Sequence, residues 1–303
     1  MDRFVEFLAS EGRSNNTLRS YRRALRLVAQ LAPVDDVSAL SKADLRQIKA
    51  ALGRYRKADG RALSNATKNH CLIAVRGLLR YLIQEEDCSV LPPDQVRLFR
   101  PVDRQVKVLR IEQLEELLAA PDVTTKTGLR DRSILEMFFS TGMRLGELAA
   151  LNRRDVNLQT REMSIRGKRS KVRVVFISPR AAEVLLRYLD GRVDHVVPLF
   201  VAHPGNLANA LPPGEEYRLS TSSIYKLVKR YARLAGIVSD PSPHVLRHTF
   251  ATDLLRNGCD LRSVQEMLGH QNVSTTQIYT HVTHPELKRS HEKYHSFSRE
   301  RAA

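Results

Sequence analysis

The chain has 303 residues, with 49 Lys and Arg against 33 Asp and Glu, and a formal net charge of +16. This length allows about two domains. The sequence has no apolar run near the ~20 residues of a membrane span, and the N-terminus MDRFVEFLAS lacks signal-peptide architecture. The cysteines, Cys71, Cys88 and Cys259, form no Cys-x-x-Cys pair. This argues against a disulfide framework or a zinc ribbon and favours the cytoplasm.

The positive charge is spread along the chain. Up to Lys107 there are 20 basic and 12 acidic residues, and beyond it 29 and 21. Each part therefore carries the same excess. Neutralising phosphates supplies most non-specific affinity for nucleic acids, so the charge indicates a nucleic-acid partner. A basic protein with no such partner is the alternative that charge alone leaves open.

Residues 1–88 are predicted to form a small helical DNA-binding domain. Ser14 is a candidate N-cap, and Ser41 with Asp44 resembles a capping box. A third helix is expected from about Ser64 to Glu86. Apolar residues follow a helical period in all three segments: Leu18, Tyr21, Leu25, Val28, Leu45, Ile48, Leu52, Tyr55, Leu72, Val75, Leu79 and Leu82.

Basic side chains gather on the polar face of the first of these helices and in the turn before the third. A charge run is often just a solvated face, but few acidic residues are interleaved here. The candidate DNA contacts are Arg19, Arg22, Arg23, Arg26, Arg54, Arg56, Lys57 and Arg61, together with Lys171 of the second domain.

Residues 89–106 are predicted to be an extended interdomain linker. Pro92, Pro93 and Pro101 break the helical period, because proline lacks the backbone donor and fixes φ.

Residues 107–303 form the second predicted domain, which is mainly helical. Two strands, 161–166 and 172–177, are expected to form a hairpin with a basic tip, which gives a small antiparallel sheet. The loop 201–219 is rich in Pro, Gly and Asn. The expected helices cover 111–120, 129–140, 179–190, 222–235, 244–257, 261–268, 274–280 and 284–295.

The segment Ser242–Thr252 carries the first chemical signal. Pro243 suits the first helical position. His244 and Arg247 then share one face near the helix N-terminus, which attracts anions, and arginine adds bidentate recognition of oxygen. A phosphate site is therefore expected, although His-x-x-Arg alone also suits a surface pair.

Two further basic residues are candidates for the same site. Arg144 lies in Thr-Gly-Met-Arg-Leu-Gly-Glu-Leu, at a glycine-containing turn; a salt bridge to Glu147 is the structural alternative. Lys168 follows Gly167 at the hairpin tip, where Lys171 is a rival for any role that it has.

His270 and Tyr279 complete the candidate set. His270 follows Leu268-Gly269, where the glycine can form a left-handed helix cap. Tyr279 lies nine residues further on, in Ser274-Thr-Thr-Gln-Ile-Tyr-Thr-His281. Taken alone, such a tyrosine is more typical of a core residue.

Together these residues resemble the tyrosine recombinase (phage integrase) family. The ordered set is Arg144, Lys168, His244-x-x-Arg247, Leu-Gly-His270 and Tyr279. The runs SPHVLRHTFATDLL and MLGHQNVSTTQIYTHV are especially similar to the Xer branch. The motif Ser14-x-x-Thr17-x-x-x-Tyr21 resembles the family's helical core-binding domain, of SAM-like type, though less specifically.

The resemblance implies strand cleavage and rejoining of double-stranded DNA without a metal or nucleotide cofactor. Tyr279 would be the nucleophile and form a 3′-phosphotyrosyl bond, with His244 as its base. Arg144, Arg247 and His270 would hold the scissile phosphate. Lys168 would be the general acid.

The resemblance also implies an architecture. Two domains would form a C-shaped clamp on a short core site, and four protomers, identical or of two kinds, would assemble on the DNA. The helix at 284–295 would contact the neighbouring protomer. A second recombinase or a DNA translocase could take part, and no membrane is involved.

Other classes of function fit parts of the same pattern. His244 with His248, and His291 with His295, are spaced for a metal, but no carboxylate or cysteine cluster accompanies them. A type IB topoisomerase uses similar chemistry, and a non-catalytic DNA-binding protein could share the fold. The complete residue set favours a recombinase.

The biological role rests on the resemblance alone. Nothing in the chain resembles an additional N-terminal arm-binding domain, which favours a simple recombinase. Resolution of chromosome dimers is the first expectation. Integration, excision or plasmid resolution by a mobile element is the alternative.

Overall fold

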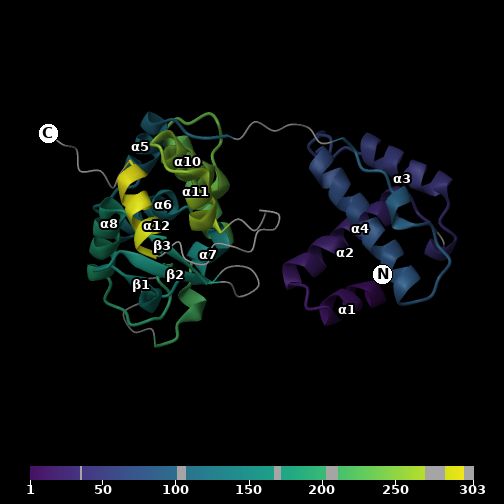
Figure 1. The fold of residues 1–303 in the computed structure, drawn as a ribbon, viewed down its shortest axis with the longest axis horizontal. Coiled ribbons are helices and arrows are strands. Elements are labelled where there is room, and N and C mark those ends of the chain that lie inside the picture. Colours follow the sequence, from purple (N-terminus) through teal and green to yellow (C-terminus); the bar gives the residue numbers. More distant parts are fainter. Residues whose placement is uncertain (35, 101–106, 167–171, 203–210, 270–283, 297–303) are drawn as a thin grey trace. The chain divides into compact units, whose positions relative to one another are not determined.

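The computed structural model describes residues 1–34, 36–100, 107–166, 172–202, 211–269 and 284–296. The chain divides into two compact units, Met1–Arg104 and Gln105–Ala303, here termed the N-terminal and C-terminal domains (Figure 1). The prediction of a mainly helical protein with a small antiparallel sheet is confirmed.

The N-terminal domain is helical. Helix α2 packs against α1, α3 and α4, so it lies at the centre of the bundle. Eight of the apolar residues expected from the helical period are buried, and Leu52 and Leu79 are fully inaccessible. Burying such a side chain contributes about 1.5–3 kcal/mol. The helices are α1 (Asp2–Ser10), α2 (Asn15–Leu31), α3 (Lys42–Arg54) and α4 (Asn65–Gln84).

Polar caps set where these helices begin. The Ser14 hydroxyl accepts a hydrogen bond from the Thr17 amide at 3.3 Å. At α3 the Asp44 amide donates to Ser41 Oγ at 3.3 Å, and the Ser41 amide donates to Asp44 Oδ2 at 2.8 Å. The predicted capping box is therefore present, and it satisfies amides that a helix start leaves without partners.

The first part of the expected linker differs from the sequence prediction. Val96 is buried in the core of the N-terminal domain. The Arg76 guanidinium donates twice to the Val96 carbonyl, and the Asn69 side chain pairs with both backbone groups of Phe99. Helix α4 ends at Gln84, before the prolines, and the chain that follows Pro92 packs back against α4. The segment up to Arg100 thus belongs to the N-terminal domain.

The C-terminal domain is built around α6. This helix contacts α5, α7, α8, α9, α10 and β3, and its residues from Ser133 onward are buried. Its elements are α5 (Ile111–Ala119), α6 (Lys126–Thr141), α7 (Leu145–Ala149), β1 (Val156–Asn157), β2 (Glu162–Arg166), β3 (Val172–Phe176), α8 (Pro179–Asp190), α9 (Thr221–Leu234), α10 (Pro243–Arg256), α11 (Leu261–Leu268) and α12 (His284–Tyr294).

The sheet has the order β1-β2-β3 and is antiparallel. In the predicted hairpin Glu162 pairs with Phe176 and Ile165 with Arg173. Met163, Ile165 and Val175 are buried in the domain core. The sheet therefore packs one face onto the helices, and its third strand leads to the site described below.

Helix α12 packs on its own domain, against α10, α11 and β3, and its predicted contact with a neighbouring protomer stays a prediction. The side chains of His291 and His295 are fully buried, with ring centroids 4.9 Å apart. Their Nε2 atoms lie 2.7 Å from the Ser140 carbonyl and 3.1 Å from the Phe139 carbonyl. Because a carbonyl can only accept, each Nε2 carries a proton and donates it.

The buried histidines make stability depend on pH. Burial lowers the pKa of His291 to about 3 and that of His295 to about 4. Both pKa values lie below the unfolded value of about 6.5, so this stability is full above pH 6.5 and is lost as the pH falls towards 4. We expect the free energy of unfolding to fall by about 2 kcal/mol per histidine from pH 8 to pH 5.

The measurement is thermal unfolding across this pH range. The comparison is the double variant His291→Gln and His295→Gln, in which the amide can still donate to the carbonyls but does not titrate. Its unfolding should depend much less on pH. Equal pH dependence in both proteins would contradict the assignment.

Candidate active site

The turn after α6 positions Arg144. Gly142 ends α6 in the left-handed conformation, with φ of +59°, and its Cα faces Phe250 and Leu268 so closely that no Cβ would fit. Arg144 then precedes α7, where its amide donates to Glu147 Oε2 at 2.7 Å. Backbone constraints on both sides therefore fix the Arg144 Cα.

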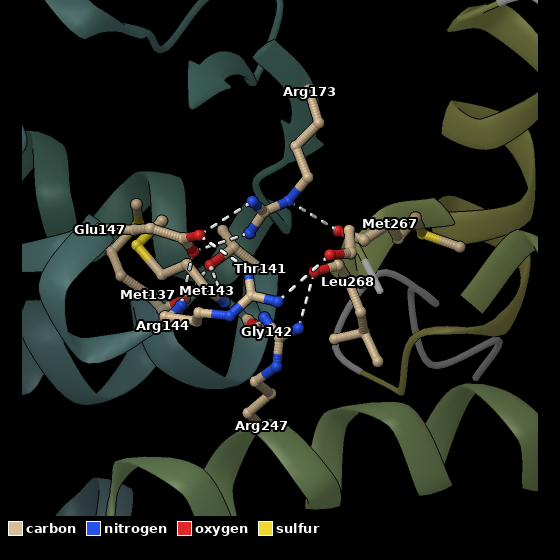
Figure 2. A network of polar contacts seen from close by, with 11 residues as sticks. Met137, Thr141, Gly142, Met143, Arg144, Glu147, Arg173, Arg247, Met267 and Leu268 are labelled. Atoms are coloured by element: carbon tan, nitrogen blue, oxygen red, sulfur yellow. Dashed lines mark hydrogen bonds and ion pairs between the residues drawn. The ribbon is translucent and has the colours of Figure 1, made fainter. Parts of the chain in front are cut away.

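Arg247 is the most buried cation of the site. Its Nη1 donates to the Gly142 carbonyl and its Nη2 to the Leu268 carbonyl, both at 2.6 Å (Figure 2). The residue is 5 % exposed, and among the described residues no carboxylate forms an ion pair with it. Burial, followed by the charges of Arg144 and Arg173, lowers its pKa to about 10. A buried guanidinium in this state favours an anion beside it.

The Arg144 side chain reaches the same place from α7. Its Nη2 donates to the Gly269 carbonyl at 3.2 Å, and its Nη1 contacts Glu147 Oε1 at 2.9 Å. The Arg144 side chain is 39 % exposed and thus accessible to a ligand. The salt bridge that the sequence left open as the structural alternative is present, and it does not consume all donors of Arg144.

Glu147 is held between two arginines. Arg173 on β3 donates from Nη1 to Oε1 at 3.0 Å and from Nη2 to Oε2 at 2.7 Å. Burial alone would raise the pKa of Glu147, but the hydrogen bonds from Arg173 and the Arg144 amide outweigh it and lower the pKa to about 2. Glu147 is therefore ionised at any physiological pH.

We call Arg144, Glu147, Arg173 and Arg247 the arginine cluster (Figure 2). It combines three guanidinium groups with one carboxylate, so it carries an excess of positive charge. Excess cations in a partly desolvated place interact much more strongly with an anion than they would in water. The arrangement is chemically suited to hold a phosphate and to stabilise charge that develops on its oxygens.

His244 lies in the first turn of α10, three residues before Arg247, and is exposed. His248 follows one turn later. Burial, and then the charges of His244 and Arg247, lower the pKa of His248. The two histidines thus stand beside the cluster at a helix N-terminus, accessible to a substrate.

The remaining candidates fall outside the described residues. These are Lys168, Lys171, His270 and Tyr279. Their chain neighbours are described: β3 places Arg173 in the cluster two residues after Lys171, and His270 follows Gly269, whose carbonyl accepts from Arg144. The structure therefore brings together Arg144 and Arg247 from the predicted set.

The sequence prediction missed Arg173. Alternation along β3 places Arg173 on the same face as Val175, which is buried. A charged residue at a core-facing strand position is uncommon without a partner, and this pattern is the signal that identifies it.

The basic candidates of the N-terminal domain are largely exposed. Arg19, Arg23 and Arg26 are exposed on α2, while Arg22 lies 3.5 Å from Asp2. Arg54 at the end of α3 and Lys57 in the turn between α3 and α4 are exposed as well.

Two arginines of that turn have local partners. Arg61 forms a 2.6 Å ion pair with Asp59. Arg56 donates from Nη1 to three carbonyls at the end of α3, those of Gly53, Arg54 and Tyr55. Cations near a helix C-terminus stabilise it, so Arg56 has a structural role whatever else it binds.

The described residues contain no group of three or more His, Cys, Asp or Glu side chains that could hold a metal ion. The paired histidines of α12 donate to backbone carbonyls instead. Within the same described ranges, none of the helices is long and apolar enough to cross a membrane.

Comparison with known proteins identifies the family. The model of the phage integrase family matches residues 107–286, and that of the phage integrase N-terminal SAM-like domain matches residues 1–86. The tyrosine recombinase XerD of Staphylococcus epidermidis is 32 % identical over 296 residues, which cover 97 % of this chain and 98 % of that protein. XerD of Listeria innocua is 34 % identical, with coverage of 97 % and 98 %.

Solved structures agree on the fold. The XerH recombinase in a pre-cleavage complex with its difH substrate is 26 % identical, with a TM-score of 0.58 and coverage of 90 % of this chain and 76 % of that one. The Tn1549 transposon integrase bound to DNA is 18 % identical, with a TM-score of 0.70 and coverage of 96 % and 97 %. With both domains matched, this chain belongs to the phage integrase family of tyrosine recombinases, enzymes that cut and rejoin DNA strands at specific sites.

Proposed function

We propose that this protein is a Xer-type site-specific recombinase that uses Tyr279 as its nucleophile and resolves chromosome dimers. The observation that carries the chemistry is the arginine cluster, in which a buried Arg247 has no carboxylate partner among the described residues and Arg144 remains accessible. A scissile phosphate would supply the missing negative charge.

When that phosphate binds, its oxygens would replace backbone carbonyls as the hydrogen-bond acceptors of Arg144 and Arg247. Arg247 now donates to the Gly142 and Leu268 carbonyls, and Arg144 to that of Gly269. A phosphate oxygen carries a negative charge that a carbonyl oxygen lacks, so a guanidinium bound to phosphate gains an ion pair, often bidentate, as well as the hydrogen bond. The arginines would stabilise the charge that grows on the non-bridging oxygens in the transition state, and His270 would add a hydrogen bond.

The covalent step would conserve the number of phosphoester bonds. The Tyr279 hydroxyl gives its proton to His244 and its oxygen attacks phosphorus, while the bond to the 5′-oxygen of the next nucleotide breaks. Lys168 protonates that leaving oxygen, and Lys171 is the rival donor. The reverse step rejoins the strand, so neither ATP nor a metal is required.

The assembly would be a tetramer on double-stranded DNA, with the two domains closing on a short core site as a C-shaped clamp. Support comes from relatives: one structural neighbour is a lambda integrase tetramer bound to a Holliday junction, 16 % identical with a TM-score of 0.68. The near-full-length similarity to XerD proteins favours a chromosomal role, in the cytoplasm, over a mobile element. This assignment includes chromosome partition at cell division.

Covalent trapping tests the proposal. A nicked suicide duplex carrying the host's chromosomal recombination site is incubated with the protein in EDTA, with Tyr279→Phe as the matched control. We expect a denaturation-resistant adduct with the wild type and none with the variant. Absence of an adduct from wild-type protein that binds this duplex would overturn the proposal, as would an adduct that persists in Tyr279→Phe.

The exposed arginines of α2 give a separate prediction on binding. Replacing Arg19, Arg23 and Arg26 by glutamine should weaken duplex binding and reduce the salt slope by about 0.9 for each phosphate that the protein no longer neutralises. Arg3→Gln is the control, because Arg3 is an exposed arginine of α1 that lies outside the candidate contacts and pairs with Glu86. Titrations at several salt concentrations measure the slopes. Equal salt slopes for the triple variant and the control would show that the DNA does not contact these arginines of α2.

A further inference from the structure

Arg173 occupies an unusual place for a charged residue. It lies on the core-facing side of β3, its side chain is 13 % exposed, and all its nitrogen atoms donate hydrogen bonds. Two bonds go to the Glu147 carboxylate on α7, and the third, from Nε, goes to the Met267 carbonyl at 3.1 Å. One side chain thus joins the third strand, α7 and the end of α11.

The end of α11 contacts all three arginines of the cluster. Successive carbonyls of Met267, Leu268 and Gly269 accept from Arg173, Arg247 and Arg144, respectively (Figure 2). The last carbonyls of a helix have no partner within it and carry partial negative charge, so cations suit them. If a phosphate draws Arg144 and Arg247 away, Arg173 alone still holds this helix end.

The fit of Arg173 at this helix end is close. Gly269 has a φ of +63°, and a Cβ there would lie 3.0 Å from Arg173 Cδ. The Arg173 stem therefore packs directly on the residue that precedes His270.

Arg173 also determines how far Glu147 neutralises the positive charge of Arg144. Without Arg173, the one carboxylate of the cluster would face Arg144 alone, and Glu147 Oε1 already lies 2.9 Å from Arg144. That pair would have no net charge. With Arg173 bound bidentately to Glu147, the guanidinium of Arg144 keeps its positive charge available to an anion.

We propose that Arg173 is a positioning residue for DNA cleavage: it binds Glu147 and the end of α11 so that Arg144 keeps an uncompensated charge. This inference rests on the proposed function, and it adds a residue that does not itself touch the phosphate.

The test compares two substrates. One nicked suicide duplex has an ordinary scissile phosphate and the other a neutral methylphosphonate at that position. Arg173→Met should reduce the rate of adduct formation about 10²-fold on the phosphate duplex, the size expected for loss of one electrostatic contribution. On the methylphosphonate duplex the loss should be less than about 5-fold, because less charge has to be stabilised there.

Two further variants separate charge from structure. Arg173→Lys keeps the charge without the bidentate geometry and should lie between wild type and Arg173→Met. The double variant Glu147→Gln with Arg173→Met removes the carboxylate that would neutralise Arg144, so it should recover part of the activity that Arg173→Met loses. Arg161→Met is the matched control, because Arg161 pairs with Glu292 at 3.1 Å outside the cluster.

Binding in the Tyr279→Phe background gives a readout that does not need cleavage. The protein with Arg173 should prefer the phosphate duplex over the methylphosphonate duplex, and Arg173→Met should lose this preference. Arg173 would have a merely structural role if Arg173→Met lost the same fraction of its cleavage rate on both duplexes. The double variant would then show no recovery of cleavage, and Arg173→Met would keep the binding preference for the phosphate duplex. Failure of wild type to form an adduct would concern the proposed function, whereas the binding preference still reports on Arg173.

Discussion

Arg247→Met should reduce single-turnover DNA cleavage by about 10²–10³-fold, the effect of removing one preorganised donor to a developing oxyanion. The reason is the position of Arg247, which is buried, held by two carbonyls and free of a carboxylate partner among the described residues. Adduct formation on a suicide duplex at saturating protein measures the effect. Duplex affinity should change far less, because many other basic residues contribute to it.

Arg256→Met is the matched control. Arg256 lies at the opposite end of the same helix, α10, and is exposed. The Arg256→Met variant should cleave DNA at a rate within a few-fold of the wild-type rate. A cleavage rate for Arg247→Met near that of the control, on DNA that both bind, would show that Arg247 does not hold the phosphate.

Gly142→Ala should destabilise the C-terminal domain by about 3 kcal/mol. A Cβ would lie 2.3 Å from Phe250 Cδ1 and 2.9 Å from Leu268 Cδ2, and the left-handed backbone adds strain. Overpacking costs about 1–3 kcal/mol, and the left-handed conformation about 1–2 kcal/mol. Because the Gly142 carbonyl also accepts from Arg247, cleavage should fall together with stability. Urea unfolding measures the first effect and suicide-substrate cleavage the second.

Gly146→Ala provides the comparison, four residues along the chain. Gly146 lies within α7, and a Cβ there would meet no atom within 4 Å. Alanine is the better helix former, so this variant should be as stable as wild type or slightly more so. Similar destabilisation of the two variants would contradict the packing at Gly142.

Local rules explain what could be predicted from sequence. Ser41 with Asp44 forms the expected capping box, and Gly269 takes the expected left-handed conformation after α11. Pro243 occupies the first position of α10. These signals depend on a few neighbouring residues, so they can be recognised in the sequence without knowledge of the rest of the fold.

Predictions that depend on tertiary contacts were less complete. Prolines do follow α4, but only the packing of Val96 and the hydrogen bonds of Arg76 show that this segment packs on the N-terminal domain. Similarly, the sequence predicts a helix at 284–295, but only the hydrogen bonds to carbonyls of α6 show that His291 and His295 are buried. In each case the contact that decides is long-range in sequence.

In the candidate active site too, residues in local motifs could be predicted from the sequence, whereas a residue defined by long-range contacts could not. Arg144 and Arg247 are identifiable from their motifs, 103 residues apart in sequence, and the structure brings both to the end of α11. Arg173 belongs to none of the recognisable motifs, and its partners on α7 and α11 lie 26 and 94 residues away. Its role follows from charge balance within the cluster, which only the fold reveals.

Identification of the residue and the DNA end in the trapped adduct tests the central claim most directly. Protease digestion of the adduct, followed by mass spectrometry, should give one nucleopeptide in which Tyr279 is joined to a 3′-phosphate, and the released strand should carry a 5′-hydroxyl. Adduct formation should be unchanged by EDTA. Attachment through another residue, attachment to a 5′-phosphate or a requirement for a divalent metal would contradict the account.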